Sequence, residues 1–341
     1  MHAGIDYQRY LEEKDSAQAD LDEWRTAFGD VAQKNGWMPV SEDRSADDQE
    51  EDLRQRIFLT KQNIASVQAA NPDANFSIMS PFSAMTNDEF TTYVMNSYIR
   101  DNSTSSSGAA TRQLRSDTGS GFGKQPQERN SGSVDWSTTK CMAPIQSQGS
   151  CGSCWAFATV SVVESAQCIA NGKTSLTKYS EQQLVSCNSQ NWGCGGGAPE
   201  YALESVQQNG LCTEDSYPYT SDVGYAYSCS SSCNAHDTGL SGYSQLSGED
   251  ELLSTIDEHP VVVAVASGNN VWKQYTGGVV SSCDSWELDH AVVAVGYDSS
   301  SIKIRNSWGT YWGENGYIRL ARSSSSEGTC GVTSDMSTPR M

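Results

Sequence analysis

Hydrophobic and polar residues follow a helical period in the first third of the chain. From residue 6 to residue 98 the sequence is charged and helix-prone, with its clearest pattern over residues 50–71. Apolar side chains recur there at spacings near three and four, at Leu53, Ile57, Ile64, Val67 and Ala70. This spacing places them on one face of a helix, which Pro72 ends. We therefore expect a helical N-terminal region.

The segment that follows has almost no hydrophobic pattern. Residues 101–131 are rich in Ser, Thr, Gly and Gln, a composition that cannot bury a core. We therefore divide the chain into an N-terminal domain (1–100), an extended linker (101–131) and a C-terminal domain (132–341). No run of about 18 apolar residues occurs in the sequence, so we expect no membrane-spanning helix.

The pattern changes again in the C-terminal domain, where Gly, Cys and aromatic residues become frequent. A helix is expected over residues 154–170. Short apolar runs predict strands at residues 260–266, 291–297, 301–305 and 316–321. A helical first half followed by a β-rich second half indicates an α+β fold in two lobes. A cleft between two lobes is a natural binding site.

Charge excludes one class of partner. The chain has 42 acidic and 22 basic side chains, so no basic stripe is available to neutralise the phosphates of a nucleic acid. All 11 cysteines lie between Cys141 and Cys330, which suggests a disulfide-bonded domain from an oxidising compartment. An odd count leaves at least one thiol unpaired, and the simplest interpretation of such a thiol is an inert buried cysteine.

Localisation signals in the sequence disagree. The first ten residues have no apolar core, so no signal peptide is present as written. We give more weight to the cysteines and expect a secreted or lysosomal/vacuolar protein whose signal peptide is not in this sequence. Asn75 and Asn102 begin N-glycosylation motifs and agree with that expectation.

The sharpest local motif contains Cys151 and Cys154, followed by Trp155. A C-x-x-C pair can be a redox pair, half of a zinc site, or one structural and one catalytic cysteine. A second C-x-x-C or an H-x-x-x-H is absent, and no βαβ pattern precedes the motif. The third interpretation is physically sound, because a cysteine that opens a helix lies at the positive end of the helix dipole, which favours the nucleophilic thiolate.

A nucleophilic cysteine also needs a histidine to exchange protons with it. Of the four histidines, only His290 opens an apolar strand; a single histidine taken alone is more often a satisfied structural residue. Asn306 follows sixteen residues later and offers an amide to orient the imidazole. Trp308 would shield that hydrogen bond from water.

With these motifs in order, the chain resembles the papain-like cysteine proteases, in particular the cathepsin L-type group. That family's signature places a histidine and an asparagine roughly 130–150 residues after C-G-[SA]-C-[WY]. Here His290 follows Cys154 by 136 residues and Asn306 follows it by 152. Further matching motifs lie around residues 134–136, 179–187, 194–197 and 308–317.

The resemblance implies a papain-like fold with a helical left lobe and a β-barrel-like right lobe. It assigns Cys154 as nucleophile, His290 as acid and base, Asn306 as the residue that orients the imidazole, and Gln148 with the Cys154 backbone N–H as oxyanion donors. No cofactor or metal is implied. The implied substrate-binding residues are Gly196, Gly197, Ala198, Pro199, Ala264, Leu288, Asp289, Ala291, Trp308 and Asp335.

Two of these groups concern the substrate directly. Gly196 and Gly197 match backbone that pairs with an extended substrate as a strand does. Asp335 matches the floor of the pocket for P2, the second substrate residue before the cleaved bond. Its walls are apolar, so apolar P2 side chains are expected, and an arginine at P2 would pair with Asp335. The competing interpretation of Asp335 is a solvated charge outside the pocket.

The N-terminal region resembles the family's inhibitory propeptide. The implied form is a small helical propeptide domain (1–100) and a cleft-spanning propeptide segment (101–131) that runs along the cleft in the reverse direction, before the catalytic domain (132–341). The competing interpretation of the N-terminal region is an unrelated helical domain. Its motifs depart from the usual pattern at Asp52, Thr60, Ser80 and Ala84, where Glu, an aromatic residue, Asn and Asp are usual. Because Ala84 is not a carboxylate, other acidic groups must supply any response of the propeptide to pH.

The disulfide framework is also implied by resemblance. Cys151 is expected to pair with Cys194, and Cys283 with Cys330. Cys187 is expected to pair with Cys229 or Cys233, and the one left over with Cys212. A bridge from Cys141 to Cys168 would then leave Cys154 as the free thiol.

The sequence thus predicts the zymogen of a cysteine endopeptidase. An exopeptidase of the same fold is disfavoured, because Cys187 and Cys194 are too close for the loop that blocks one end of the cleft. The other alternative is a catalytically inactive relative that binds or supports other proteins. Expected partners are protein or peptide substrates, the chain's own propeptide and cystatin-type inhibitors; we expect a monomer that binds neither nucleic acid nor membrane.

Overall fold

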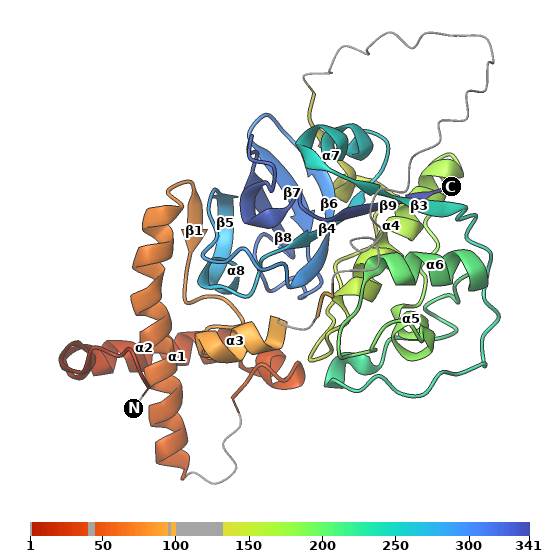
Figure 1. Ribbon diagram of the computed structural model, residues 1–341. Helices are drawn as coiled ribbons and strands as arrows, with labels where there is room; N and C mark the ends of the chain where they lie inside the picture. Colours follow the sequence, from red (N-terminus) through yellow and green to blue (C-terminus); the bar gives the residue numbers. More distant parts are fainter. Residues whose placement is uncertain (1, 40–44, 95–96, 100–131) are drawn as a thin grey trace, which may run out of the picture.

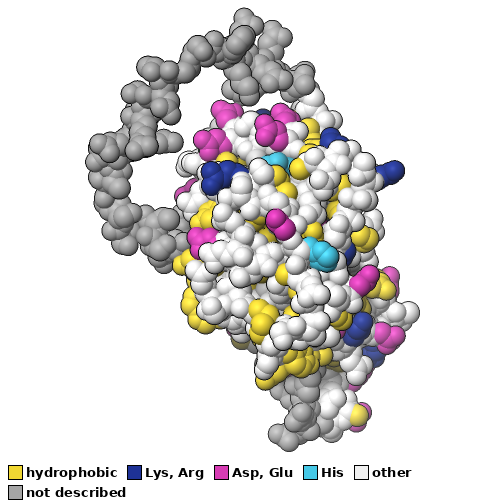
Figure 2. Space-filling model, turned by 90° about the vertical axis from the view of Figure 1, so that its right-hand side faces the viewer, with side chains coloured by type: hydrophobic (Ala, Val, Ile, Leu, Met, Phe, Trp, Pro, Cys, Tyr) yellow, Lys and Arg dark blue, Asp and Glu magenta, His cyan; other side chains and the backbone are white. Residues whose placement is uncertain are grey.

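The computed structural model describes residues 2–39, 45–94, 97–99 and 132–341. Three groups of elements lie side by side in Figure 1: the N-terminal helices, a central sheet, and helices α5 and α6 on the opposite side. Among the described residues, no helix is both long enough and apolar enough to cross a bilayer. On the face in Figure 2, basic side chains are scattered and form no continuous stripe.

Two long crossing helices dominate the N-terminal region. They are α1 (Tyr7–Lys34) and α2 (Ala46–Ala70), followed by strand β1 (Ala74–Phe76) and helix α3 (Asn87–Val94). Asp6 and Ser45 cap the two long helices, since each side chain accepts a hydrogen bond from an N–H of the first turn. The apolar face predicted for α2 is buried at Ile57 and Val67, but Ala70 in the last turn is exposed.

Most strands of the sheet come from the last hundred residues. The remaining strands are β2 (Val134–Asp135), β3 (Gly242–Leu246), β4 (Val261–Val265), β5 (Tyr275–Val280), β6 (His290–Tyr297), β7 (Ser301–Arg305), β8 (Tyr317–Ala321) and β9 (Met336–Arg340). Their order is β1-β5-β8-β7-β6-β4-β9-β3, with β2 paired to β6. All pairs are antiparallel except β5 with β8. The four strands predicted from the sequence are therefore confirmed as β4, β6, β7 and β8.

The N-terminal region is joined to this sheet. Strand β1, which the sequence pattern does not predict, pairs with β5 through Ala74 opposite Gly278. Side chains of both regions also share one apolar core, which includes Trp24 and Phe82 of the N-terminal region and Trp272 and Trp308 of the C-terminal domain. The N-terminal region is therefore packed against the C-terminal domain.

The helical lobe consists of α4 (Cys154–Ala170), α5 (Glu181–Cys187) and α6 (Pro199–Asn209). Helix α4 has the bounds that the sequence predicts, and its side chains are buried on nearly every face because it lies between the lobes. Two short helices, α7 (Gly248–Ile256) and α8 (Asn270–Gln274), accompany the sheet. The predicted α+β fold in two lobes is confirmed.

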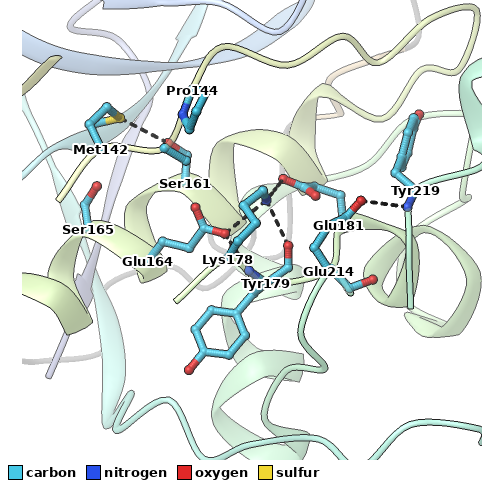
Figure 3. A network of polar contacts seen from close by, with 12 residues as sticks. Met142, Pro144, Ser161, Glu164, Ser165, Lys178, Tyr179, Glu181, Glu214 and Tyr219 are labelled. Atoms are coloured by element: carbon cyan, nitrogen blue, oxygen red, sulfur yellow. Dashed lines mark hydrogen bonds and ion pairs between the residues drawn. The ribbon is translucent and has the colours of Figure 1, made fainter. Parts of the chain in front are cut away.

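A buried ion cluster joins α4 to α5 (Figure 3). The Lys178 ammonium lies 3.0 Å from the Glu164 carboxylate and 2.7 Å from that of Glu181. Both carboxylates are only 1% exposed, and Glu164 also accepts the N–H of Tyr179 at 2.7 Å. One lysine therefore serves two buried carboxylates.

Five disulfides link the described cysteines. The pairs are Cys141–Cys168, Cys151–Cys194, Cys187–Cys229, Cys212–Cys233 and Cys283–Cys330. They match the expected framework, with Cys229 rather than Cys233 as the partner of Cys187. Each bridge contributes about 2–4 kcal/mol of stability in the usual range. Cys154 is the free cysteine.

Candidate active site

The free thiol of Cys154 lies at the first turn of α4, where the two lobes meet. Ser153 precedes the helix as its N-cap residue and makes no side-chain capping bond, while its carbonyl accepts the N–H groups of Ala156 and Phe157. From the β lobe, the N–H of Ala291 lies 3.3 Å from the Cys154 Sγ atom. Burial raises the pKa of the Cys154 thiol to about 12, although this N–H opposes the shift. In this state Cys154 carries its proton.

His290 begins strand β6, immediately before Ala291. Its Nε2 atom is 2.8 Å from Oδ1 of Asn306, an oxygen that also accepts the N–H of Ser307. Because Oδ1 only accepts, Nε2 must donate, which leaves Nδ1 as the basic nitrogen. Nδ1 has no hydrogen-bond partner among the described residues. Burial lowers the pKa of His290 to about 4, so the imidazole is neutral in this state.

Trp308 holds the imidazole in place. Its ring stacks on that of His290 with centroids 4.8 Å apart and an angle of 19° between the planes. Both side chains are 1% exposed, so water does not compete for the bond between His290 and Asn306. This is the shielding expected of Trp308 from the sequence.

Gln148 lies beside Cys154 with its amide held at both ends. Its Nε2 donates to the Cys151 carbonyl at 2.9 Å, while its Oε1 accepts the Ser307 hydroxyl at 2.6 Å. The Tyr219 hydroxyl donates to the Gln148 backbone carbonyl at 2.8 Å and lies 2.9 Å from the Ser153 hydroxyl. Ser307 could have been found from the sequence, because it directly follows the predicted site residue Asn306. No pattern in the sequence points to Tyr219.

The glycines near Cys194 are required by the local geometry. Gly196 has φ +104°, a conformation that side chains disfavour. A Cβ at Gly197 would meet the Asn191 amide at 2.6 Å. That amide in turn accepts the Ala198 N–H at 2.8 Å and fixes the loop. The loop therefore presents its backbone to the space beside Cys154.

A short N-terminal segment occupies that space. Gly197 donates its N–H to the Ser97 carbonyl at 3.3 Å and accepts the Ile99 N–H at 3.0 Å. Tyr98, between them, runs parallel to Gly197 and donates its N–H to the Asp289 carbonyl at 3.2 Å. These residues lie before residue 100, so the N-terminal region reaches the site ahead of the expected linker, which lies outside the described residues.

The Tyr98 side chain identifies a pocket in the β lobe. Its hydroxyl donates to Asp335 Oδ2 at 2.7 Å. The Asp335 carbonyl accepts the N–H of Ala264, and Ala264 lies opposite Ala291 in the pairing of β4 with β6. Leu288 packs close to Gly331, at the edge of the same region. The structure thus brings the predicted P2 residues of this lobe together, while Ala198 and Pro199 begin α6 on the other side of Gly197.

The Asp289 side chain is held in place by Ser267 and Gly268. Its carboxylate accepts the Ser267 N–H and hydroxyl and the Gly268 N–H at 2.8–3.0 Å. Burial nevertheless raises the pKa of Asp289 to about 6, because it outweighs these hydrogen bonds. No motif in the sequence indicates the roles of Ser267 and Gly268.

Further contacts of the N-terminal region lie at Gly149, Ser150 and Trp308. The Tyr93 hydroxyl donates to the Gly149 carbonyl at 2.7 Å, and the Ser150 hydroxyl donates to the Asn35 carbonyl at 2.6 Å. Rings of Trp37, Phe82, Phe90 and Tyr93 pack together, and the last three pack on Trp308. The thiol is therefore enclosed from both directions by the same N-terminal region.

Within the described ranges, no group of three or more His, Cys, Asp or Glu side chains is arranged to hold a metal ion. A two-lobed α+β fold with a cysteine and a histidine at the lobe junction, covered by an N-terminal region, defines the class of the cysteine peptidase precursors.

Comparisons with known proteins specify the family. The family described as papain family cysteine protease matches residues 131–340. Thiol protease SEN102 from Hemerocallis sp. is 33% identical over 302 residues, which are 85% of this chain and 81% of that protein. Papain from Carica papaya is 41% identical over 201 residues, 58% of this chain and 57% of that protein. The chain belongs to the papain family of cysteine proteases, and its relatives are cysteine endopeptidases.

Solved structures extend the likeness to the N-terminal region. The proform of Amb a 11, a cysteine protease and ragweed pollen allergen, has a TM-score of 0.76 and 28% identity, covering 100% of this chain and 96% of that chain. Digestive procathepsin L 3 of Tenebrio molitor has a TM-score of 0.70 and 27% identity, covering 93% and 99% respectively. The covering region is therefore a propeptide, and an unrelated helical domain is excluded.

Proposed function

We propose that this chain is the zymogen of a cysteine endopeptidase in which Cys154 is the nucleophile and His290 its acid and base. One observation carries the proposal: Cys154 opens a helix beside the strand of a histidine whose other nitrogen is fixed by Asn306. That arrangement supplies a thiol at a positive helix end and a base whose free nitrogen is Nδ1.

The reaction requires the propeptide to leave. The Cys154 proton then passes to His290 Nδ1, and the thiolate attacks the carbonyl carbon of the peptide bond. The oxyanion that forms accepts hydrogen bonds from the Cys154 N–H and the Gln148 amide, where one such donor is typically worth about 3 kcal/mol. His290 gives its proton to the leaving amine. Water, deprotonated by His290, then hydrolyses the thioester.

Substrate selection is proposed to centre on P2. Small apolar walls at Ala264 and Ala291 favour leucine, valine or phenylalanine by burial alone. The bond from the Tyr98 hydroxyl to Asp335 supports a carboxylate directed into the pocket rather than a solvated one. An arginine at P2 would form a charge-assisted bond with Asp335.

The biological setting follows from the same features. Five disulfides favour an oxidising compartment, so we propose a secreted or lysosomal/vacuolar enzyme. Asn75 is exposed on β1, which is compatible with glycosylation, whereas Asn102 lies outside the described residues. Cystatin-type inhibitors, monomeric state and absence of nucleic-acid binding remain part of the proposal.

A thiol-directed epoxide tests the central assignment. After acid treatment, the mature enzyme is expected to be labelled at Cys154 and to cleave peptides internally. Cys154→Ser should abolish labelling and cleavage, and His290→Ala should abolish cleavage. An unlabelled, inactive mature chain would support the non-catalytic alternative instead. Removal of single residues from peptide ends would support an exopeptidase.

A further inference from the structure

A cavity of about 300 Å³ lies beside the P2 pocket while the propeptide is still in place. Its lining residues are Tyr98, Trp286, Leu288, Glu327, Gly331 and Ser334. Its volume is at the lower end of the range for pockets that bind small ligands. None of the residues assigned to catalysis lines it.

The cavity is adjacent to the P2 pocket through shared residues. Leu288 belongs to the walls of both, and Ser334 precedes Asp335, which receives the Tyr98 hydroxyl. Tyr98 fills the P2 pocket and at the same time lines the cavity. Because Tyr98 belongs to the propeptide, its departure removes the side chain that separates the two spaces.

The lining of the cavity is suited to a cation. Trp286 is 63% exposed, a high value for an indole, and Glu327 is also exposed. No basic side chain lines the cavity. An indole face and a carboxylate are the two groups that proteins commonly use to hold an ammonium or guanidinium group.

Packing at the base keeps the space open. Gly331 has φ +81°, and a Cβ added there would lie 2.5 Å from Leu288 Cδ2. Leu288 can therefore lie directly against the backbone at residue 331. A residue with a side chain at that position would push Leu288 toward the cavity.

We infer that, in the mature enzyme, this cavity extends the P2 pocket and selects long cationic P2 side chains, which Glu327 and the face of Trp286 bind in addition to Asp335. The inference rests on the proposed function, since it concerns the same substrate position. Leucine at P2 is too short to reach these two residues, so their effect is restricted to arginine and longer cationic side chains.

Four peptides that differ only at P2 test the inference with the mature enzyme. The P2 residues are leucine, arginine, citrulline as the neutral analogue of arginine, and homoarginine with one more methylene. Enzyme concentrations are set by titration with a thiol-directed epoxide, and kcat/KM is measured for each peptide. The variants are Trp286→Ala, Trp286→Phe and Glu327→Gln, with Glu287→Gln as a matched control, since Glu287 is exposed nearby but does not line the cavity.

Trp286→Ala is expected to lower kcat/KM for the arginine and homoarginine peptides by about two- to fivefold, the size of an exposed cation–π contact. Trp286→Phe should restore most of this loss, because phenylalanine keeps an aromatic face. Glu327→Gln should lower cleavage of the arginine peptide by about two- to fivefold and spare citrulline. Leucine should be unaffected throughout, and Glu287→Gln should change no ratio.

Two other results have distinct meanings. If Trp286→Ala and Glu327→Gln leave the arginine-to-leucine and homoarginine-to-leucine ratios at parental values, the cavity does not select the substrate and the inference is wrong. Cleavage of the leucine peptide would in that case leave the proposed function intact. If the parent enzyme cleaves none of the four peptides, the proposed function fails and the inference fails with it.

Discussion

Glu164 makes the stability of the helical lobe depend on pH in a direction opposite to that of most carboxylates. Burial raises the pKa of Glu164 from 4.5 to about 7, and the neighbouring Glu181 charge adds to the shift while Lys178 opposes it. The folded chain therefore binds this proton more tightly than the unfolded chain does. The resulting stabilisation is fully present below pH 4.5 and is lost as the pH rises through about 7.

The size of the effect follows from the shift. From 4.5 to about 7, at 1.36 kcal/mol for each pKa unit, the contribution is about 3 kcal/mol. Glu164→Gln replaces the carboxyl group by a neutral analogue that can still accept the Tyr179 N–H. Relative to the parent, the free energy of unfolding of the variant should therefore increase by about 3 kcal/mol between pH 4.5 and pH 7.5.

Urea unfolding at a series of pH values measures this difference. Both proteins carry Cys154→Ser so that proteolysis does not interfere, and the propeptide is common to both, so its own titration cancels. Glu258→Gln, at an exposed carboxylate, serves as control and should run parallel to the parent. Parallel curves for Glu164→Gln across the same window would refute the reasoning, because they would mean that Glu164 has the same proton affinity folded and unfolded.

Three further predictions concern the zymogen. Burial raises the pKa of Cys154 from its ordinary 9.0 to about 12, so alkylation of the precursor thiol at neutral pH should be about a thousandfold slower than that of an exposed cysteine. Equal rates would contradict the enclosure of the thiol. Burial raises the pKa of Glu89, but its hydrogen bonds to Arg56 and Thr86 outweigh burial and hold that pKa below 4.5. The stabilisation by Glu89 is therefore present above pH 4.5 and is lost as the pH falls below it. Glu89→Gln should therefore make processing of the precursor at pH 5–6 severalfold faster by gel assay, whereas Asp88→Asn should not. Residues 1–130 added separately should inhibit the mature enzyme. Tyr98→Phe in that segment should weaken inhibition about tenfold, because it removes the hydrogen bond to Asp335. Equal inhibition constants would show that this bond is unimportant.

Regular elements with a strong local signal were predictable from the sequence. Helix α4 has the predicted bounds because apolar residues recur on related faces from Cys154 to Ala170, and β7 has the predicted bounds as well. Strand β1 was not predicted, since three residues carry no period and their partner strand lies about two hundred residues away. The local hydrophobic pattern indicates which residues of an element are buried. It does not indicate which distant element covers them.

The site shows the same division. His290 and Asn306 were predictable because motif spacing and strand position agree. The roles of Tyr219 and Tyr98 depend on the path of the chain through space, and a tyrosine in a polar segment has no distinguishing signal. The buried position of Glu164 was equally hidden, because its partner Lys178 lies on the loop before α5 rather than on the same helix.

The parallel pairing of Tyr98 with Gly197 has a consequence for inhibitor chemistry. By resemblance, a substrate runs through this groove in the opposite direction. The carbonyl carbon of its cleaved bond then faces the Cys154 thiol. A peptide threaded backwards can use the same backbone contacts and the same side-chain pocket without presenting a cleavable bond to Cys154. Short peptides built on residues 97–99 in the native direction, with the tyrosine retained, are therefore starting points for reversible ligands that the enzyme would hold without consuming.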